Sequence, residues 1–355
     1  MKIAVVDVAA SVGGALSVLN DFCDTIRKRR DENTWYILTS VIKIQESDNI
    51  INLQYPEVKK SWWSRIHWEK NVFPELMRKY EIDVVFSLQN SALPGGNYKQ
   101  IVYFHNVLLL QKIGTFVNLK MCDLQNAIRV NILGPYTRKT WKNADIIIVQ
   151  ENFVKELISK YYDENKVVVV RPNVNIEQTS EEISTSICGY IYPASALSYK
   201  NIEALIEAER SLNKQNKEIN IMITIQGNEN SYARRMVKKA KNVRGIRFIG
   251  RQDRKKLYEL YKNYGLIMTS RLESFGMPII EAMQSGTVVI GLDKEYFTEI
   301  ANGYSRAYVA LEEDNLPEIM EKGLTDTKAG NYVNENNEGW ESVIDIIVGK
   351  GTYES

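Results

Sequence analysis

Residues 265–286, "GLIMTSRLESFGMPIIEAMQSG", place an apolar run, a polar turn and a helical pattern in direct succession. The run "GLIM" predicts a buried strand, and Pro278 suits the first turn of a helix that continues through "IIEAM". In a parallel sheet such a strand-to-helix turn lies at the carboxyl edge, where open α/β proteins bind ligands and the helix offers free N–H groups. This stretch therefore predicts an α/β fold with a ligand site, and phosphate is the expected ligand.

The same succession extends over all 355 residues. The first half contains the runs "IAVV", "WYIL", "IDVVF", "IVYF", "DIIIV" and "VVVV", and after the polar segment 171–185 the pattern restarts with "ICGYIY", "INIMITI", "IRFI", "GLIMTS" and "TVVIGL". This alternation is typical of parallel sheets with helical crossovers. Because the chain is too long for one ordinary core, we predict two Rossmann-like α/β domains, over 1–175 and 185–335, facing across a cleft.

Composition excludes several classes of protein. Hydrophobic residues make up 44% and charged residues 25%, which is typical of a globular protein, and the net charge of +1 lacks the basic excess of nucleic-acid binders. The apolar run of the N-terminus "MKIAVVDVAA" has only four residues before Asp7, too few for a signal peptide. No run of 18 apolar residues, the length of a membrane-spanning helix, occurs in the sequence. Cys23, Cys122 and Cys188 lie far apart and only two histidines occur, so neither a zinc site nor a disulfide framework is indicated. We expect a protein of the reducing cytoplasm.

Two glutamates flank the turn of the opening stretch. Gly276 lets a ligand approach the backbone closely, and Glu281, expected in the first helical turn, can accept bonds from hydroxyl groups such as those of a ribose. Glu273, before the turn, can do the same for a sugar. The spacing alone is equally compatible with ordinary surface glutamates, one of which complements the helix dipole.

The segment "ESFGMPIIE", extended by "EAMQSG", resembles the nucleotide-sugar site of the retaining GT-B glycosyltransferases of family 4, which carries a Glu, seven residues, Glu pattern. The resemblance covers nearly all of the chain and is strongest over 187–300. It implies an N-terminal acceptor-binding domain, a C-terminal donor-binding domain, and a helix within 336–355 that can cross back to the N-terminal domain. It also implies that Glu281 binds the ribose of the donor and Glu273 the transferred sugar. Ser274, Phe275 and Gly276 would form the turn whose main-chain N–H groups hold sugar or phosphate oxygens.

Lys200, in "YPASALSYKNIEALIEA", stands just before an amphipathic helical pattern. A cation there opposes the helix dipole unless an anion lies between them, and the resemblance implies that this anion is the donor diphosphate. Taken alone, a lysine is more often solvated surface. The family often has an arginine several residues earlier, whereas "IYPASALSY" contains none. Arg251, which follows a predicted strand where the family lines its base pocket, is the candidate to compensate.

Two N-terminal features extend the resemblance. Gly13 and Gly14 join the first strand to a helix like the family's glycine loop, although a tight turn explains a glycine pair equally well. His105 closes the strand "QIVYF" at the position of a family histidine that faces the donor sugar, although a lone histidine there is more often structural. The dinucleotide fingerprint and the Walker A loop are both missing, which argues against a dehydrogenase and an NTPase.

The resemblance predicts transfer of a hexose-type sugar from a UDP-, GDP- or dTDP-sugar to a hydroxyl of a glycan or lipid-linked acceptor, with retention at the anomeric carbon, in cell-surface polysaccharide or lipopolysaccharide synthesis. No Asp-x-Asp motif occurs, so no metal and no other cofactor is expected. A nucleotide-sugar 2-epimerase is one alternative, disfavoured by the two histidines. A non-catalytic nucleotide-sugar-binding scaffold is another, disfavoured because Lys200, Glu273 and Glu281 are all present.

The segment 59–79, "KKSWWSRIHWEKNVFPELMRK", interleaves three tryptophans with basic residues. Aromatic rings with basic neighbours suit a membrane interface, so this segment can hold the enzyme peripherally on the inner face of the membrane. The alternative is a core helix whose tryptophans pack inward. The basic run 234–256 is expected to be a solvated helix face.

Overall fold

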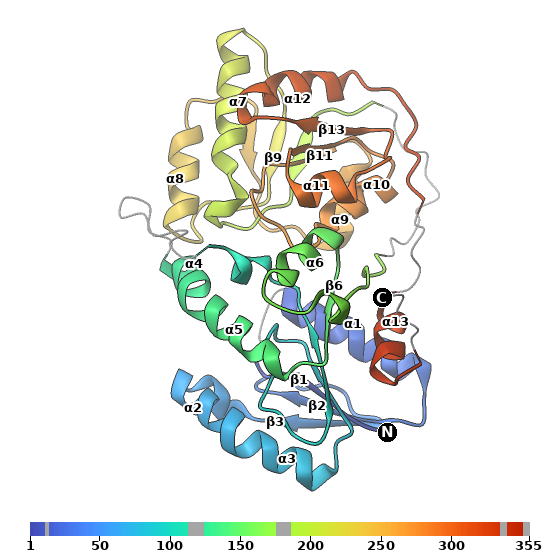
Figure 1. The fold of residues 1–355 in the computed structure, drawn as a ribbon. Helices are drawn as coiled ribbons and strands as arrows, with labels where there is room; N and C mark the ends of the chain where they lie inside the picture. The colour runs from blue at the N-terminus through green and yellow to red at the C-terminus, as the bar shows by residue number, and fades with distance from the viewer. Residues whose placement is uncertain (11–13, 113–123, 175–185, 334–338, 351–355) are drawn as a thin grey trace. The chain divides into compact units, whose positions relative to one another are not determined.

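The computed structural model describes residues 1–10, 14–112, 124–174, 186–333 and 339–350. The chain divides into two compact units (Figure 1). The first unit is Met1–Asn173 with Asn336–Ser355, and the second unit is Val174–Glu335. The segment 175–185, between the two predicted domains, lies outside the described residues. The predicted fold class is confirmed, because each unit contains a parallel sheet with helical crossovers.

The first unit has a seven-stranded parallel sheet in the order β3-β2-β1-β4-β5-β6-β7. Its strands are β1 (Lys2–Asp7), β2 (Thr34–Thr39), β3 (Ile50–Gln54), β4 (Val84–Ser87), β5 (Lys99–Tyr103), β6 (Ile146–Val149) and β7 (Val167–Val169). Its helices are α1 (Gly14–Arg29), α2 (Trp62–His67), α3 (Phe73–Tyr80), α4 (Leu124–Ile128), α5 (Gly134–Thr140), α6 (Asn152–Ser159) and α13 (Gly339–Ile347). Single turns of other helix types are η1 (Pro56–Lys59), η2 (Trp68–Val72), η3 (Val107–Leu110), η4 (Arg129–Leu133), η5 (Trp141–Asn143) and η6 (Glu164–Lys166).

The two faces of this sheet bury two separate cores, as the alternation of side chains along β1 requires. Ile3 and Val5 face a core that contains residues of α1 and α13. Ala4 and Val6 face a core that contains Trp68 and residues of α3. Each face of β1 is therefore apolar, which explains why its sequence is a continuous hydrophobic run.

The predicted C-terminal helix is present as α13 and belongs to the first unit. Arg29, at the end of α1, bonds Glu341 at 2.9 Å and Asp345 at 2.6 Å on α13. The start of α13 also lies against the end of the first part of the chain, because a Cβ placed on Gly339 would be 2.7 Å from the Cβ of Asn173.

The second unit has a six-stranded parallel sheet in the order β10-β9-β8-β11-β12-β13. Its strands are β8 (Tyr190–Tyr192), β9 (Ile221–Ile223), β10 (Ile246–Phe248), β11 (Gly265–Met268), β12 (Val289–Leu292) and β13 (Ala307–Ala310). Its helices are α7 (Ile202–Lys214), α8 (Ser231–Ala240), α9 (Arg254–Tyr261), α10 (Met277–Gln284), α11 (Glu295–Ile300) and α12 (Leu316–Leu324), with the single turns η7 (Ser198–Lys200) and η8 (Glu313–Asn315). The chain leaves β8 toward β9 on one side and returns to β11 on the other, so the strand order reverses between β8 and β11. Ligands of open α/β sheets bind at such a reversal.

Two strands, β3 and β13, have no counterpart among the predicted strands. Both lie at a sheet edge and both are mostly half-buried. The sequence of β3, "IINLQ", is interrupted by polar residues and lacks the sustained apolar run by which the buried strands are recognised. The sequence of β13, "AYVA", is apolar, so its strand was missed although the signal is present.

Candidate active site

The loops that follow β8 and β11 bring Lys200 and Glu273 together. Lys200 ends the turn η7 after β8, and Glu273 lies in the turn after β11, the neighbouring strand. The Lys200 ammonium pairs with Oε1 of Glu273, and both side chains are largely buried, at 13% and 15% exposure. Ser270 donates to the same oxygen at 2.6 Å. Oε2 of Glu273 accepts no hydrogen bond from the described residues, so it is left for a ligand hydroxyl.

Buried hydroxyl groups fix the backbone that carries this pair. The hydroxyl of Tyr192, at the end of β8, lies 2.7 Å from the carbonyl oxygen of Lys200 and 2.7 Å from Oγ of Ser270. Thr269 donates to the carbonyl of Asn201 at 3.0 Å, and Asn201 adopts a left-handed conformation between η7 and α7. Because these bonds involve the backbone, the position of the Lys200 loop does not depend on its own ammonium group.

Glu281 is buried, at 4% exposure, in α10. It is the fifth residue of that helix and lies in the second turn, so the expectation of a first-turn position was wrong. Its Oε1 accepts from Nε of Arg254 at 2.9 Å and from the hydroxyl of Tyr258 at 3.3 Å, both on α9. Burial raises the pKa of Glu281, against the opposing effect of Arg254. Its Oε2 accepts no bond from the described residues, which leaves one carboxylate oxygen for a ligand.

The turn between the two glutamates is built around Gly276. This residue is the left-handed N-cap of α10, with φ of 68°, and a Cβ there would lie 3.0 Å from side chains of Ile279 and Ile300. Glycine alone satisfies both the dihedral angle and the close packing. Phe275 is buried and Ser274 half-buried beside it, and the N–H groups of Phe275 and Gly276 donate to no described group. The predicted anion-holding turn thus has the geometry to hold one.

Arg251, the predicted substitute for the missing arginine, is exposed in the segment after β10. The cation that contacts Glu281 is Arg254, which, like Tyr258 and Ser270, is not among the residues predicted from the sequence. The available signal was the four-residue spacing of Arg254 and Tyr258, which puts both side chains on one face of α9. The partner of that face could not be identified from spacing.

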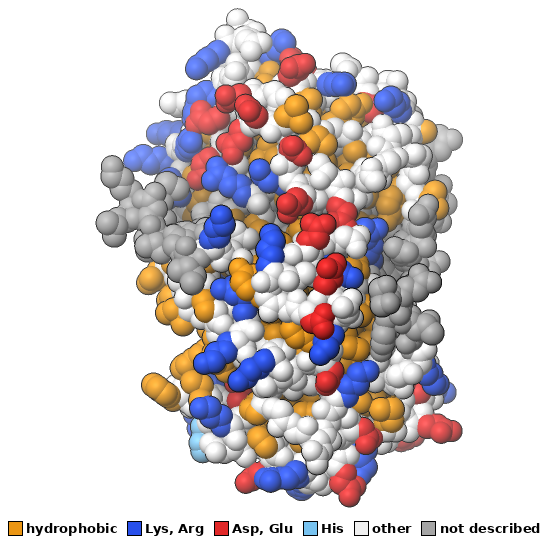
Figure 2. All heavy atoms as spheres, in the orientation of Figure 1, with side chains coloured by type: hydrophobic (Ala, Val, Ile, Leu, Met, Phe, Trp, Pro, Cys, Tyr) orange, Lys and Arg blue, Asp and Glu red, His pale blue; other side chains and the backbone are white. Residues whose placement is uncertain are grey.

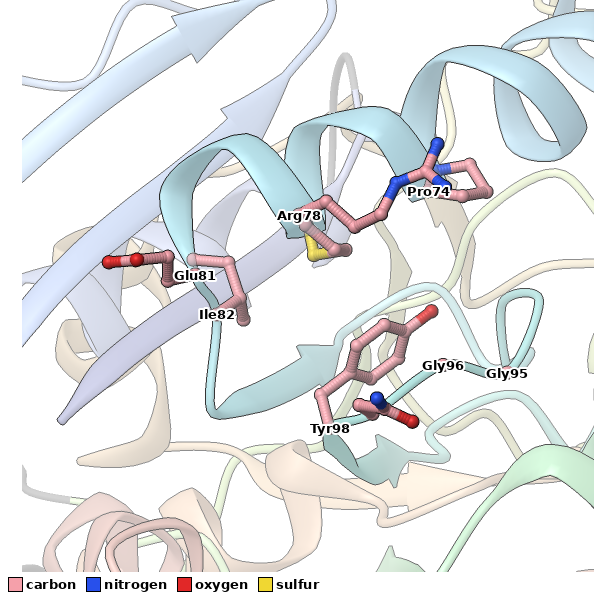
Figure 3. Close-up of a pocket in the computed structure, with 9 residues that line it drawn as sticks. Pro74, Arg78, Glu81, Ile82, Gly95, Gly96 and Tyr98 are labelled. Atoms are coloured by element: carbon pink, nitrogen blue, oxygen red, sulfur yellow. The ribbon is translucent and has the colours of Figure 1, made fainter.

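Two predicted residues of the first unit, His105 and Gly14, follow strands at the carboxyl edge of its sheet. His105 follows β5, and burial lowers its pKa to about 4, so the ring is neutral at physiological pH. Gly14 begins α1, whereas Gly13 lies outside the described residues. Figure 3 draws a hollow at the opposite, amino edge, lined by Arg78, Gly96 and Tyr98, in which the Glu81 side chain turns away toward Lys2.

Within the described ranges, no cluster of three or more His, Cys, Asp or Glu side chains has the arrangement of a metal site. None of the helices described is long and apolar enough to cross a bilayer.

Residues 189–340 match the family model of glycosyl transferases group 1. The chain contains a glycosyltransferase group 1 domain. This domain covers the second unit from the first residues of its sheet and includes Lys200, Glu273 and Glu281.

Relatives of the glycosyltransferase group 1 domain differ in how much of this chain they match. The "Probable sucrose-phosphate synthase" of Thermosipho melanesiensis is 26% identical over 309 residues, which are 75% of this chain and 71% of the relative. The UDP-N-acetylglucosamine–peptide N-acetylglucosaminyltransferase GtfA subunit of Limosilactobacillus reuteri is 30% identical over 138 residues. That match spans 38% of this chain and 26% of the GtfA subunit.

Solved structures show that the glycosyltransferase group 1 domain is part of a GT-B fold. Sucrose-phosphate synthase from Thermosynechococcus elongatus has a TM-score of 0.69 at 15% identity, covering 98% of this chain and 94% of its own. WaaG, a glycosyltransferase involved in lipopolysaccharide biosynthesis, has a TM-score of 0.68 at 14% identity, and the match covers 98% of this chain and 100% of the WaaG chain. Anabaena HepE, solved with UDP and glucose, has a TM-score of 0.62 at 14% identity, and the match covers 98% of this chain and 95% of the HepE chain. The predicted GT-B architecture is confirmed.

Proposed function

We propose that this chain is a retaining glycosyltransferase that moves a hexose-type sugar from a nucleoside-diphosphate sugar to a hydroxyl of a glycan or lipid-linked acceptor. The observation that carries the proposal is the buried Lys200–Glu273 pair at the strand-order reversal, directly before the N-terminus of α10. A buried cation, two free N–H groups and two half-satisfied carboxylates suit a ligand that carries both phosphate and hydroxyl groups.

Each part of the donor has a matching group in the second unit. The Lys200 ammonium and the N–H groups of Phe275 and Gly276 are assigned to the diphosphate. Oε2 of Glu281 is assigned to the ribose hydroxyls, and Oε2 of Glu273 to a hydroxyl of the transferred sugar. The second unit is thereby assigned as the donor domain, and the first unit is assigned to the acceptor.

In the proposed step the bond between the anomeric carbon and the diphosphate oxygen breaks while the acceptor oxygen bonds the same carbon on the same face. The proton of the acceptor hydroxyl passes to the leaving phosphate oxygen. This step requires no carboxylate nucleophile, so Glu273 and Glu281 position the donor. Because no Asp-x-Asp motif occurs in the chain, we assign neutralisation of the leaving diphosphate to Lys200 and the helix N–H groups, without a metal.

Uridine is the base to test first. HepE was solved with UDP and glucose, and GtfA is named for a UDP-sugar. WaaG acts in lipopolysaccharide biosynthesis, which supports a role in cell-surface polysaccharide assembly for this chain.

We expect one nucleoside diphosphate among UDP, GDP and dTDP to stabilise the protein. At about 100 times its dissociation constant it should add about 2.7 kcal/mol and raise the melting temperature by several degrees. Thermal unfolding with each diphosphate and with its parent nucleoside measures this, because the nucleoside lacks the group assigned to Lys200. If no diphosphate shifts the melting temperature, the donor site is wrong.

We also propose that the protein works at the cytoplasmic face of a membrane, with part of 59–79 in contact with lipid. Trp68 is buried, so the inward-packing alternative holds for that residue, but Trp63 is 77% exposed and Trp62 41%. The ring of Trp62 contacts Tyr136 on α5, with centroids 5.5 Å apart. Figure 2 shows hydrophobic side chains where Figure 1 places α2 and α4, with Lys and Arg side chains beside them.

A second exposed apolar row continues this face. Leu124, Ile128 and Ile132 are exposed and four residues apart, which places them on one side of the helix formed by α4 and η4. No acidic residue occurs between 124 and 144. Of the two glutamates of 59–79, Glu69 is buried against Arg65 and Glu75 is exposed on α3. Apolar rows with a basic surround fit an anionic bilayer.

The variant Trp63→Ser with Leu124→Ser should bind anionic phosphatidylglycerol vesicles more weakly, on the order of tenfold or more, because two apolar anchors are removed. Vesicle co-sedimentation measures this. Leu311→Ser, which changes an equally exposed leucine of the second unit, is the matched control and should bind as the native protein does. Equal binding of both variants, or no binding by the native protein, would refute the membrane face.

A further inference from the structure

Asn201 directly follows Lys200 and is the N-cap residue of α7, but its side chain does not cap the helix. An N-cap asparagine ordinarily accepts a hydrogen bond from a main-chain N–H of the first helical turn. In this protein the N–H of Ile202 donates to the hydroxyl of Tyr232 on α8, at 3.0 Å. The Asn201 amide is therefore used for another purpose, although the residue is only 2% exposed.

The Asn201 amide bonds to two charged side chains from two other loops. Its nitrogen donates to Oε1 of Glu313 at 2.8 Å, and its oxygen accepts from Nη2 of Arg271 at 3.1 Å. The same Nη2 donates to the same Oε1 of Glu313 at 3.1 Å, so the three side chains are bonded pairwise. They come from the loops after β8, β11 and β13, and we name Asn201, Arg271 and Glu313 the loop bridge.

The loop bridge joins the two loops that carry the Lys200–Glu273 pair. Asn201 follows Lys200 by one residue, and Arg271 precedes Glu273 by two. The main-chain N–H of Arg271 also donates to the carbonyl of Tyr199 at 2.8 Å, so the two backbones lie side by side. The loop bridge adds a third loop, the one after β13, as a support outside the pair. Because a displacement of about 1 Å in a reacting group can lower a rate about 10²-fold, such support affects the chemistry.

The buried amide is the part of the loop bridge that specifies position. The side chains of Arg271 and Glu313 are 60% and 46% exposed, and ion pairs at such exposure contribute little by themselves. Both polar atoms of the Asn201 amide are bonded, so any displacement of this residue leaves a buried polar atom unpaired. Its φ of 53° is left-handed, a conformation that asparagine and glycine tolerate. Glycine at this position would therefore remove the amide and keep the backbone conformation.

We propose that Asn201 is a positioning residue for Lys200, and that the loop bridge holds the Lys200 ammonium on Glu273. Asn201 acts through the lysine and is not assigned to any part of the donor. The position of the ammonium follows from the contacts of the loop bridge alone. Only the consequence for binding of the donor diphosphate rests on the proposed function.

The first test follows the Lys200 ammonium without a ligand. The protons of a buried, paired ammonium exchange slowly with water in ¹⁵N NMR, and the Lys200 signal is the one that is lost in Lys200→Ala. Asn201→Gly should speed this exchange about tenfold or more, because the pair is held less firmly. Asn216→Gly is the matched control, since Asn216 is also left-handed, with φ of 57°, but is exposed, and it should leave the exchange unchanged. Native exchange in Asn201→Gly would overturn the proposal.

The second test exchanges the partners within the loop bridge. Asn201→Asp places a carboxylate against Glu313, so like charges repel and the Lys200 exchange should again become faster. Adding Glu313→Gln supplies an amide that donates to the new carboxylate, and Arg271 can still pair with it. The double variant should therefore regain the native exchange rate. If it stays as fast as Asn201→Asp alone, the loop bridge does not position the lysine.

The third measurement is the affinity for the nucleoside diphosphate that stabilises the protein. Asn201→Gly should weaken binding about fivefold or more in the native background and should have no further effect in Lys200→Ala, because it acts through that lysine. An equal loss in both backgrounds would indicate a merely structural role and refute the proposal. If no diphosphate binds while both exchange experiments give the expected results, the proposed function fails and the positioning of Lys200 by Asn201 stands.

Discussion

Replacing Lys200 by alanine should lower the rate of sugar release from the donor by about 10²–10³-fold, with the protein still folded. The ammonium is the buried cation assigned to the diphosphate, and its removal leaves the Glu273 carboxylate without its counter-charge. That carboxylate would then repel the phosphates at the moment when their negative charge increases. Hydrolysis of the donor with water as acceptor measures the effect, so the natural acceptor need not be known.

The Lys200 prediction has two internal controls. Lys217→Ala removes a lysine that pairs with Glu321 on the surface of the same unit, and its rate should stay within about twofold of native. The double variant Lys200→Ala with Glu273→Gln should be less impaired than the product of the two single effects, because the unpaired charge is then absent. A Lys200→Ala rate close to native would remove the diphosphate assignment and favour a non-catalytic scaffold.

Replacing Glu281 by glutamine should raise the dissociation constant of the donor nucleotide about 10–100-fold. A hydrogen bond to a charged group contributes about 1.5–3 kcal/mol, and glutamine keeps the shape of the side chain while removing the charge. The partner left behind, Arg254, is half exposed, so water can compensate its guanidinium and the fold should be retained. Calorimetric titration with the nucleotide identified by thermal shift measures the loss.

The pH dependence of nucleotide affinity gives a second test of Glu281. Burial raises the pKa of Glu281, so its carboxylate is protonated at a higher pH than an ordinary glutamate. The charged form is the one assigned to the ribose, so nucleotide affinity should fall as the pH is lowered, beginning above the usual glutamate range. Glu281→Gln should lack this part of the pH dependence. Glu259→Gln, an exposed glutamate paired with Lys262, should retain both the affinity and its pH dependence. A native pH profile in Glu281→Gln would contradict the assignment.

The sequence was sufficient where the signal is local. The buried strands, the proline-started helix α10 and the glycine turn all follow from contiguous residues, and the structure confirms them. The meeting of Lys200 with Glu273 was expected only through the family pattern. It depends on β8 and β11 being neighbours, and 72 residues separate them in the chain.

The rest of the site depends on contacts that no local pattern encodes. Arg254 reaches Glu281 from another helix, and Asn90 orients His105 from a left-handed turn fifteen residues earlier. Burial of Trp68 but not Trp63, five residues before it, follows from which side of α2 and η2 packs on the sheet. Each of these features is set by tertiary packing, which overrides what spacing alone can predict.

The meeting of Asn173 with Gly339 gives the chain the topology of an inserted domain. The polypeptide leaves the first unit at Asn173 and rejoins it close to the same place. The second unit is therefore inserted between two adjacent positions of the first unit. Insertions of this kind are well tolerated by their hosts. The second unit of a related chain could therefore be grafted in by two cuts. Under the proposed function, donor choice could then change in evolution or in the laboratory without rebuilding the first unit. Conversely, a single truncation after residue 175 would remove α13 together with the second unit. The face of the first unit that contains α1 would then be uncovered.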